Sequence, residues 1–471
     1  MNLAILFLSC LTLIKFKQPL NAQTIPKFRV MILTDIEADP DDAQSMVRFL
    51  TYANQWDIEG LIATTSIHQK TRVAPETIHK ILQAYQKVQP NLLKHEKGYP
   101  AYEELKTKVK KGLPVYGMNG VGAGKDSEGS EWIINTLKKN DSRPLWIPAW
   151  GGTNCLAQAL WKIRQNETTS QAQKLYDKIR VYTISDQDDS GPWIRKTFPS
   201  IFYIASPGYT YGHATWLGIA FPMPGSDKIV TGNEWLAENI QQGHGPMGAA
   251  YPDVAYGMEG DSPAFLYLVP NGLNEPEHPN YGGWGGRYEF YTPSLKKDTM
   301  FARPDWPEDE PESRSLWTNA EDSVVSAIDK QGYKSIQATI WRWRTEFQND
   351  FAARMDWCTK SFSEANHPPI PALVHKDLFT VRSGEQFHLN AEGTQDPDGD
   401  SMSYLWFQYK EAGTYPGTVS FRPYAANLYD LPVTAPPVDS PKTIHFILKV
   451  TDKGKPALTR YKRVIVTVVP K

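Results

Sequence analysis

The sequence predicts an α/β domain, built on a mostly parallel sheet flanked by helices, followed by a C-terminal β-sandwich. Between residue 27 and about residue 220, short apolar runs alternate with amphipathic stretches, which is typical of strand–helix–strand units. From residue 367 onward the apolar side chains instead recur at every second position, as in antiparallel strands. A proline-rich segment, His367–Pro371, separates the two patterns. We therefore expect the α/β domain to span residues 24–366 and the sandwich to span residues 367–471.

The α/β pattern can be divided into individual elements. Strands are predicted at Phe28–Thr34, Ile58–Thr64, Leu145–Trp150, Ile179–Ile184 and Ile201–Ala205. Helices are predicted at residues 42–53, 73–88, 155–164, 320–329 and 333–355. Ligands of such sheets bind outside the carboxyl ends of the strands, so we expect the functional side chains directly after each strand.

The C-terminal region has short β-type runs separated by turns, such as Ser403–Phe407, Thr443–Leu448 and Arg463–Val468. About 100 residues with this pattern predict a small β-sandwich. The segment Asp396–Asp400, Asp-Pro-Asp-Gly-Asp, resembles a turn of the immunoglobulin-like modules appended to secreted bacterial enzymes. We expect a plain Asp/Gly turn there, with a calcium site as the alternative.

The first 23 residues are typical of an export signal. An apolar run, Leu3–Ile14, is too short to span a membrane comfortably, and Leu20-Asn21-Ala22 offers a cleavage site before Gln23. The alternative is an N-terminal anchor helix. A lipoprotein is disfavoured because Cys10 lies inside the apolar run. We therefore expect a periplasmic or secreted protein, with no membrane partner beyond the signal.

Composition argues against a nucleic acid as partner. Lys and Arg total 50 against 52 Asp and Glu, the formal net charge is −2, and the basic residues form no stripe. Apart from Cys10, the cysteines are Cys155 and Cys358, for which buried thiols are expected in preference to a disulfide. Their spacing from histidines predicts no zinc site. Nothing in the composition indicates or excludes oligomerisation.

An acidic cluster after the first strand is the strongest functional feature. Asp35, Glu37, Asp39, Asp41 and Asp42 place five carboxylates within eight residues. They repel one another unless a cation or solvent relieves the charge. An acidic helix N-terminus would account for only one or two of them. Because the ligands are all oxygen atoms, we expect a hard cation, Ca²⁺ first and Mg²⁺ second.

The pattern Asp35-x-Glu37-x-x-x-Asp41-Asp42 resembles the Asp-x-Asp-Pro-Gly-x-Asp-Asp signature of the calcium-dependent nucleoside hydrolases. The resemblance implies that Glu37 and Asp42 bind calcium, that Asp35 lies beside the ion, and that Asp41 is the base that activates the attacking water. Glu37 stands where the family has Asp, and Asp39 lies in the altered Pro-Gly segment. Asp39 is therefore the alternative ligand.

Two later segments also resemble this family. Trp150–Asn154 resembles its Gly-Pro-Leu-Thr-Asn turn, which implies that the carbonyl of Thr153 binds calcium. Glu259–Pro263 lies where the family has its late ligand, which implies that role for Asp261. Members with a catalytic histidine carry it directly before that Asp, whereas this chain has Gly260.

Without that histidine, the general acid has three candidates: Glu259, His244 and His68. Side chains after other strands and in glycine-rich loops are expected to contact the substrate. The substrate-binding candidates are His68, Asn119, Asn154, Asp186, Glu259 and Trp284.

The whole chain, including Asp57–Ser66 and the C-terminal tail, is similar to a bacterial family described as nucleoside-hydrolase-like, cellulose-binding proteins. The expected function is hydrolysis of a glycosidic or N-glycosidic bond, with water activated by Asp41 at a calcium site. The rival is a non-catalytic protein that binds a cellulose-like glycan. A glycan or glycoside is the expected partner under both hypotheses.

Overall fold

The computed structural model describes residues 27–206, 214–293, 312, 314–420 and 428–471. The predicted export signal, residues 1–23, lies outside the described residues. Within them, no helix combines the length and the apolar character needed to cross a membrane.

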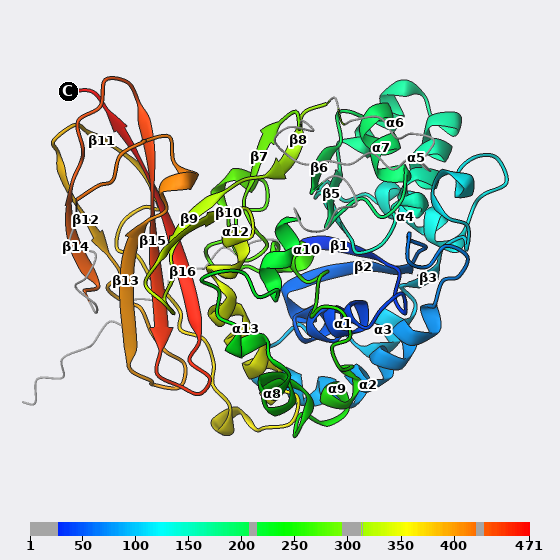
Figure 1. Cartoon of the computed structure of the whole chain (residues 1–471), viewed down its shortest axis with the longest axis horizontal. Coiled ribbons are helices and arrows are strands. Elements are labelled where there is room, and N and C mark those ends of the chain that lie inside the picture. The colour runs from blue at the N-terminus through cyan, green and yellow to red at the C-terminus, as the bar shows by residue number, and fades with distance from the viewer. Residues whose placement is uncertain (1–26, 207–213, 294–311, 313, 421–427) are drawn as a thin grey trace, which may run out of the picture.

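A large sheet forms the centre of the N-terminal part of the chain (Figure 1). Its strands are β1 (Phe28–Thr34), β2 (Trp56–Ala63), β3 (Val109–Lys111), β4 (Leu145–Ala149), β5 (Ile179–Thr183), β6 (Phe202–Ala205), β7 (Tyr288–Tyr291) and β8 (Leu316–Asn319). They are arranged in the order β3-β2-β1-β4-β5-β6-β8-β7, and only the β7–β8 pair is antiparallel. The predicted mostly parallel sheet is therefore confirmed.

Helices cover both faces of this sheet. The helices of the α/β region are α1 (Asp41–Thr51), α2 (Pro75–His95), α3 (Tyr102–Lys106), α4 (Glu128–Lys138), α5 (Asn154–Asn166), α6 (Thr169–Tyr176), α7 (Ser190–Thr197), α8 (Asn233–Leu236), α9 (Gly245–Ala250) and α10 (Pro263–Leu266). Val30 and Ile32 of β1 pack in one core with α1 and α2. Met31 and Leu33 point to the other face and pack with α4, α5 and α7. This alternation follows from the two-residue period of a strand.

The predicted helix at residues 320–329 is wrong. The chain there forms a hairpin of β9 (Asp322–Val325) and β10 (Gly332–Ser335). Ser323, Val324 and Val325 favour a strand, and the antiparallel partner satisfies their backbone groups. The predicted helix at 333–355 is divided into α12 (Ala338–Trp341) and α13 (Arg344–Asp356).

The C-terminal region is a sandwich of two sheets, as the sequence predicts. Its strands are β11 (Leu378–Arg382), β12 (Gln386–Asn390), β13 (Met402–Gln408), β14 (Asp430–Thr434), β15 (Lys442–Asp452) and β16 (Thr459–Val469). One sheet has the order β11-β16-β15-β13, and the other pairs β12 with β14. Alternate apolar side chains of β15 and β16 fill the core between them.

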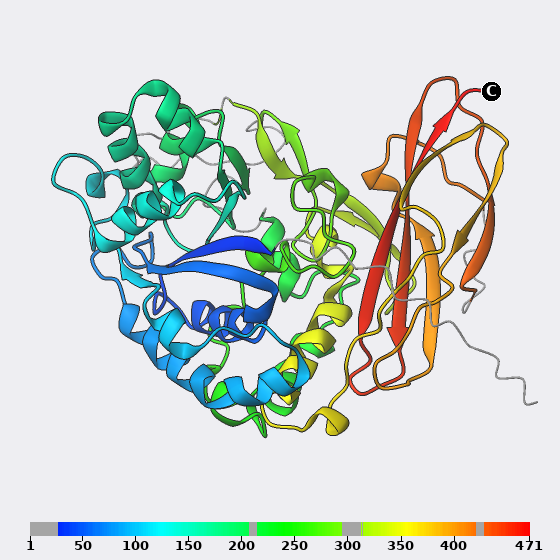
Figure 2. The ribbon, with the colours of Figure 1, turned by 180° about the vertical axis from the view of Figure 1, so that it is seen from behind.

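The sandwich packs closely against the α/β part, beside α13 and the β9–β10 hairpin in both views (Figures 1 and 2). The ring of Tyr461 contacts the rings of Trp284 and Trp343. The guanidinium of Arg463 donates hydrogen bonds to the carbonyl oxygens of Leu273 and Gly282. Trp284 is fully buried at this contact.

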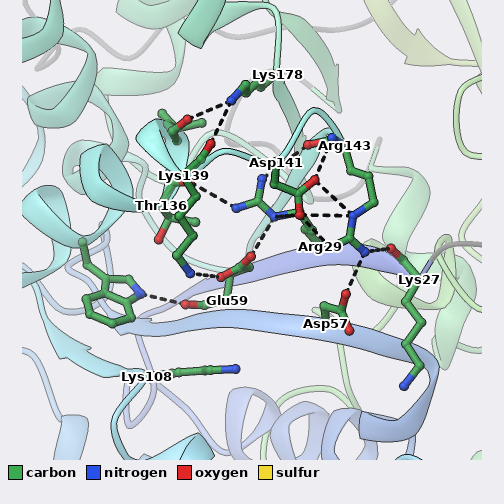
Figure 3. A network of polar contacts seen from close by, with 12 residues as sticks. Lys27, Arg29, Asp57, Glu59, Lys108, Thr136, Lys139, Asp141, Arg143 and Lys178 are labelled. Carbon is green, nitrogen blue, oxygen red and sulfur yellow. Dashed lines mark hydrogen bonds and ion pairs between the residues drawn. The ribbon is translucent and has the colours of Figure 1, made fainter.

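A charged network closes the amino ends of β1 and β2, at the edge of the sheet away from the acidic loop (Figure 3). Arg29, which is fully buried, donates to Glu59 at 2.7 Å, and Lys139 also pairs with Glu59. Arg143 bridges Asp57 and Asp141 nearby. Burial disfavours the charged form of Glu59, but the hydrogen bonds from Lys139 and Arg29 outweigh it and lower its pKa.

Candidate active site

Five aspartates converge beyond the carboxyl end of β1. Asp35, Asp39, Asp41, Asp42 and Asp261 line one small cavity of about 60 Å³. The first four come from the β1–α1 segment, and Asp261 comes from the turn before α10. No lysine or arginine is among the described residues that line it. The edge of the sheet at which ligands were expected is thus strongly acidic.

Local hydrogen bonds shape the acidic loop. The amide of Ile36 donates to the hydroxyl of Thr34 at 3.1 Å, and the amide of Asp41 donates to Oδ1 of Asp39 at 2.9 Å. The hydroxyl of Thr34 also donates to Asp42. Nε2 of Gln69 donates to the carbonyl of Asp35 at 3.2 Å. These bonds hold the loop in place, and no lysine or arginine among the described lining residues pairs with its carboxylates.

Asp41 is held by the backbone of a distant segment. The amide of Gly260 donates to Oδ2 of Asp41 at 3.0 Å. Burial, the contact with Asp39 and the charge of Asp42 raise the pKa of the Asp41 carboxyl. A carboxylate with a raised pKa, fixed in position at a cavity wall, is suited to accept a proton.

The pKa values of three further carboxyls, those of Asp35, Asp42 and Asp261, are also raised. Burial is the largest cause, and it raises the pKa of Asp35 to about 7. Burial followed by the charge of Asp35 raises the pKa of Asp42. Asp261 is only 2% exposed, and its Oδ2 has no hydrogen-bond partner among the described residues. Burial and then the charges of Asp41 and Asp42 raise its pKa.

These residues fit a hard cation. One oxygen from each of Asp39, Asp41 and Asp42 can lie within 4.8 Å of the others. Asp261 lines the same cavity, and its Oδ2 has no hydrogen-bond partner among the described residues. An oxygen-only ligand set of this kind suits Ca²⁺ or Mg²⁺.

Glu37 lies apart from this cluster. Its carboxylate pairs with Arg72 and accepts a hydrogen bond from Thr77, and it is not among the residues that line the cavity. Its backbone has a φ of +78°, a left-handed conformation that turns the side chain away from its neighbours. Of the two alternatives that the sequence left open, Asp39 is the one that lies at the cavity.

The turn that follows β4 packs closely against the acidic cluster. A Cβ atom at Gly151 would lie 2.5 Å from Oδ1 of Asp35, so a glycine is needed for this close approach. The hydroxyl of Thr153 lies 2.7 Å from that of Ser190, and its carbonyl accepts the amide of Ala157 inside α5. Thr153 is not among the residues that line the acidic cavity.

Three of the six substrate-binding candidates have side chains that pair with residues outside the cavity. Asp186 forms a bidentate ion pair with Arg195, and Glu259 pairs with Arg48 at 2.9 Å. Asn154 donates to the carbonyl of Val115 at 2.8 Å. These three side chains are buried and hold loops in place.

Two further substrate-binding candidates and the candidate acid His244 lie away from the cavity, and one candidate lies at it. Trp284 is part of the contact with the sandwich, where it packs against Tyr461 from the far end of the sequence. Asn119 is exposed and is not among the lining residues. His244, a candidate acid, pairs with Asp356 at 3.1 Å. His68 alone of these candidates lines the cavity.

A second, larger cavity opens directly above the acidic one, with a volume of about 760 Å³. The residues that line both cavities are Ala38, Asp39, Asp41, His68 and Trp216. The additional residues of the upper wall are mostly apolar. They are Leu217, Phe221, Met223, Tyr256 and Gly257.

The apolar wall of the larger cavity was not predicted from the sequence. Trp216, Phe221 and Tyr256 lie between the strand predicted at Ile201–Ala205 and the helix predicted at 320–329, where no element was predicted, so no pattern placed them on a common face. The high share of aromatic residues, 12% of the sequence, is the one indication of such a wall. Nε1 of Trp216 donates to the hydroxyl of Ser185 at 3.0 Å, which fixes the ring over the acidic cavity.

The fold and the acidic edge together define a nucleoside-hydrolase-like protein. Residues 29–288 match the family model "Cellulose-binding Sde182, nucleoside hydrolase-like domain". Residues 386–468 match "Cellulose-binding protein Sde0182, C-terminal domain". The chain therefore belongs to this family. A search of curated proteins gave no match.

A solved structure extends the similarity to nearly the whole chain. It is described as a nucleoside hydrolase-related hypothetical protein from Saccharophagus degradans that is associated with carbohydrate metabolism. The two sequences are 36% identical, with 94% of this chain and 100% of the other covered and a TM-score of 0.78. Two effector proteins, XOO4466 and an ADP-ribose complex of XopQ, give TM-scores of only 0.29 and 0.28. They are 9% and 11% identical over 63% of this chain and 88% of theirs, and nothing about its function follows from them.

Proposed function

We propose that the protein is an exported, metal-dependent hydrolase that cleaves the glycosidic bond of a glycoside or N-glycoside. The observation that carries this proposal is the position of Asp41. Its carboxylate is fixed by the amide of Gly260, its pKa is raised, and it lines both the acidic cavity and the larger cavity above it. A group in that position can take a proton from a water held between the two cavities.

The acidic cavity supplies the rest of the required chemistry. A bound Ca²⁺ would neutralise the carboxylates and orient sugar hydroxyls and the attacking water. Asp39, Asp42 and Asp261 are the residues that would hold the ion, with Asp35 beside them. The negative charge of this group also favours the positive charge that develops on a sugar ring as the bond to the leaving group breaks.

The leaving group must be protonated, and the cavity must offer a surface that can bind it. His68 is the candidate acid that lines the cavity, since Glu259 pairs with Arg48 and His244 with Asp356. Trp216 and Phe221 offer apolar ring surfaces in the upper wall, on which a sugar or a flat leaving group can stack. We therefore assign protonation of the leaving group to His68.

The domain arrangement and the expected export indicate the type of substrate. Under this proposal the signal at residues 1–23 is removed, residues 24–366 carry the hydrolytic site, and residues 367–471 form an immunoglobulin-like module. The names of the matching families contain the words cellulose-binding, which favours a glycan as the partner. Hydrolysis outside the cytoplasm is more useful on glycans and glycosides than on salvaged nucleosides.

The second candidate function is glycan binding without catalysis. Gly260 favours it, because this position lacks the histidine that the resembled nucleoside hydrolases place before their late ligand. Trp216 occupies the space beside Gly260, where a Cβ atom would lie 2.8 Å from its ring. A binding protein could retain the acidic pocket as a hydroxyl-binding site alone.

The two functions are separated by measuring turnover and binding on the same variants. Wild type, Asp41→Asn and the exposed control Asp253→Asn would be assayed with aryl glycosides, nucleosides and cello-oligosaccharides in the presence of calcium. We expect hydrolysis by wild type and the control, and a loss of at least about a hundredfold in kcat for Asp41→Asn. Cellulose-oligosaccharide binding without turnover in all three proteins would instead support the binding function.

A further inference from the structure

The turn at residues 259–262 carries two groups of the proposed active site. The amide of Gly260 donates to Asp41, and Asp261 lines the acidic cavity. Glu259, the first residue of the turn, is fully buried and is not among the described residues that line either cavity. Its carboxylate can therefore act on the site only through the turn, and not by touching a substrate.

The turn packs on one face of α1. Four residues of this helix contact it, and they are Asp41, Gln44, Ser45 and Arg48. Residues that follow the first at three, four and seven positions lie along one side of a helix. The amide of Glu259 donates to Oε1 of Gln44 at 3.0 Å, and the hydroxyl oxygens of Ser262 and Ser45 lie 3.1 Å apart. These contacts fix where the turn lies along the helix.

The carboxylate of Glu259 meets a donor at each of its two oxygens. Nη1 of Arg48 pairs with Oε2 at 2.9 Å, and the hydroxyl of Ser262 donates to the same oxygen at 2.8 Å. The hydroxyl of Tyr251 donates to Oε1 at 2.9 Å. Only a side chain that accepts at both ends satisfies this arrangement, and an ionised glutamate does so.

Arg48 is itself held firmly. It is 0% exposed, and Glu259 is its acidic partner within the part of the chain that the structure describes. Its Cζ lies 4.3 Å from the centre of the Phe351 ring, and it donates to Gln348. A guanidinium with so little freedom also fixes the carboxylate that pairs with it.

The backbone of Glu259 adopts a conformation that needs such support. Its φ is +51°, in the left-handed region that residues other than glycine seldom occupy. A conformation of this kind persists where the surrounding contacts determine it. The next amide along the chain, that of Gly260, is the one that reaches Asp41.

We propose that Glu259 is a positioning residue of the acidic cavity. Its buried carboxylate fixes the turn from inside the protein, so that the amide of Gly260 reaches Asp41 and the carboxylate of Asp261 reaches the cavity. This role rests on the proposed function where turnover is concerned, whereas its effects on cation binding and on the turn can be measured without a substrate.

The test compares nearly isosteric substitutions in two buried ion pairs. Glu259→Gln places an amide nitrogen against at least one donor, whichever way the new side chain is turned. The matched control is Glu59→Gln, which likewise takes a carboxylate away from a buried arginine, Arg29, but at the amino ends of the strands. Tyr251→Phe removes a single donor and keeps the test valid if Glu259→Gln does not fold.

Three quantities would be measured for wild type and these variants. They are the calcium affinity by isothermal titration, the hydrogen exchange of the amides at residues 259–262 by mass spectrometry, and kcat and KM. Denaturant unfolding of each variant gives its stability, so that a loss of stability can be separated from a loss of positioning.

We expect Glu259→Gln to bind calcium about tenfold or more weakly, and to lose about tenfold or more in kcat with KM changed by less than about threefold. Its amides at residues 259–262 should exchange faster than those of Glu59→Gln. Tyr251→Phe should show a smaller loss of calcium affinity, roughly threefold. Glu59→Gln should lose stability but keep the calcium affinity, kcat and KM of wild type.

Wild-type calcium affinity and exchange in folded Glu259→Gln would overturn this role, and the same result in Tyr251→Phe would do so if Glu259→Gln does not fold. An equal loss of calcium affinity in Glu59→Gln would also overturn it, because lost stability would then be the cause. If wild type hydrolyses no substrate, the proposed function fails while calcium affinity and exchange still decide the role of Glu259. If wild type also binds no calcium, the exchange rates decide it alone.

Discussion

The amide of Gly260 donates a hydrogen bond of 3.0 Å to Oδ2 of Asp41, and these two residues are 219 positions apart in the sequence. A Cβ atom at residue 260 would lie 2.7 Å from that oxygen and 2.8 Å from the ring of Trp216. The position thus has room for an amide but none for a side chain. In this chain Trp216 fills the space that a larger residue at 260 would need.

This contact predicts the effect of Gly260→Ala. The added methyl group would displace Asp41 or Trp216, so we expect at least about a tenfold loss of kcat and a loss of about 1–3 kcal/mol in the free energy of unfolding. The control is Gly332→Ala, because a Cβ atom there would contact nothing within 4 Å. Denaturant unfolding and turnover would be measured on both. Wild-type behaviour of Gly260→Ala would show that the contact does not position Asp41.

Two conservative substitutions decide which residue near the start of α1 binds the cation. Asp39 lines the acidic cavity, whereas Glu37 pairs with Arg72. We expect Asp39→Asn to weaken calcium binding at this site by about tenfold or more, and Glu37→Gln to leave it nearly unchanged. Isothermal titration with calcium measures both. A larger loss of calcium affinity in Glu37→Gln than in Asp39→Asn would show instead that Glu37 is the ligand.

The raised pKa values predict how pH acts on the acidic cluster. Below about pH 7 the Asp35 carboxyl of the metal-free protein holds a proton that the unfolded chain has already released. The free energy of unfolding of the metal-free protein should therefore fall as the pH rises from about 5 to about 7. Thermal unfolding in a chelator, at several pH values, checks this direction. A rise over the same interval would contradict it.

Calcium should reverse that trend, because it binds the deprotonated carboxylates and displaces their protons. We expect the affinity of the active-site ion to be roughly tenfold higher at about pH 8 than at about pH 6. Isothermal titration with calcium at the two pH values measures this difference. Equal affinities at the two pH values would show that these carboxyls are not the ligands.

The network around Glu59 predicts an acid-sensitive contribution to stability. Its pKa is lowered, so its stabilisation is complete above the pKa of the unfolded chain and is lost as the pH falls through the lower value of the folded state. Glu59→Gln should cost about 2–4 kcal/mol at about pH 7, because Arg29 stays buried without its partner, and much less at about pH 3. Denaturant unfolding at both pH values tests this. An equal cost at the two values would show that charge is not involved.

Much of the fold and the core of the site could be predicted because their determinants are local. The strand Phe28–Thr34 and the carboxylates that follow it are consecutive in sequence, and a parallel sheet places them at its carboxyl edge. The switch from alternating strands and helices to two-residue periodicity likewise predicted the sandwich. The hairpin at residues 322–335 was missed because a few β-type residues pair with a neighbour that periodicity does not identify.

The rest depended on contacts between distant segments. Glu37 lies outside the cluster because Arg72 and Thr77 bind its carboxylate, and nothing in the acidic motif indicates them. Trp284 lies in the core because Tyr461, 177 residues later, packs against it. Neither hydrophobic periodicity nor a sequence motif identifies such partners. The sequence therefore indicated which residues could be functional but not which side chains surround them.

The most direct test of the central claim is the calcium-dependent hydrolysis of a glycoside by wild type and Asp42→Ala, measured together with bound calcium. The account predicts that wild type binds calcium and turns over substrate, and that Asp42→Ala loses both a bound calcium ion and the turnover. Wild-type calcium binding and full turnover in Asp42→Ala would contradict a hydrolytic metal site at the acidic edge of the sheet.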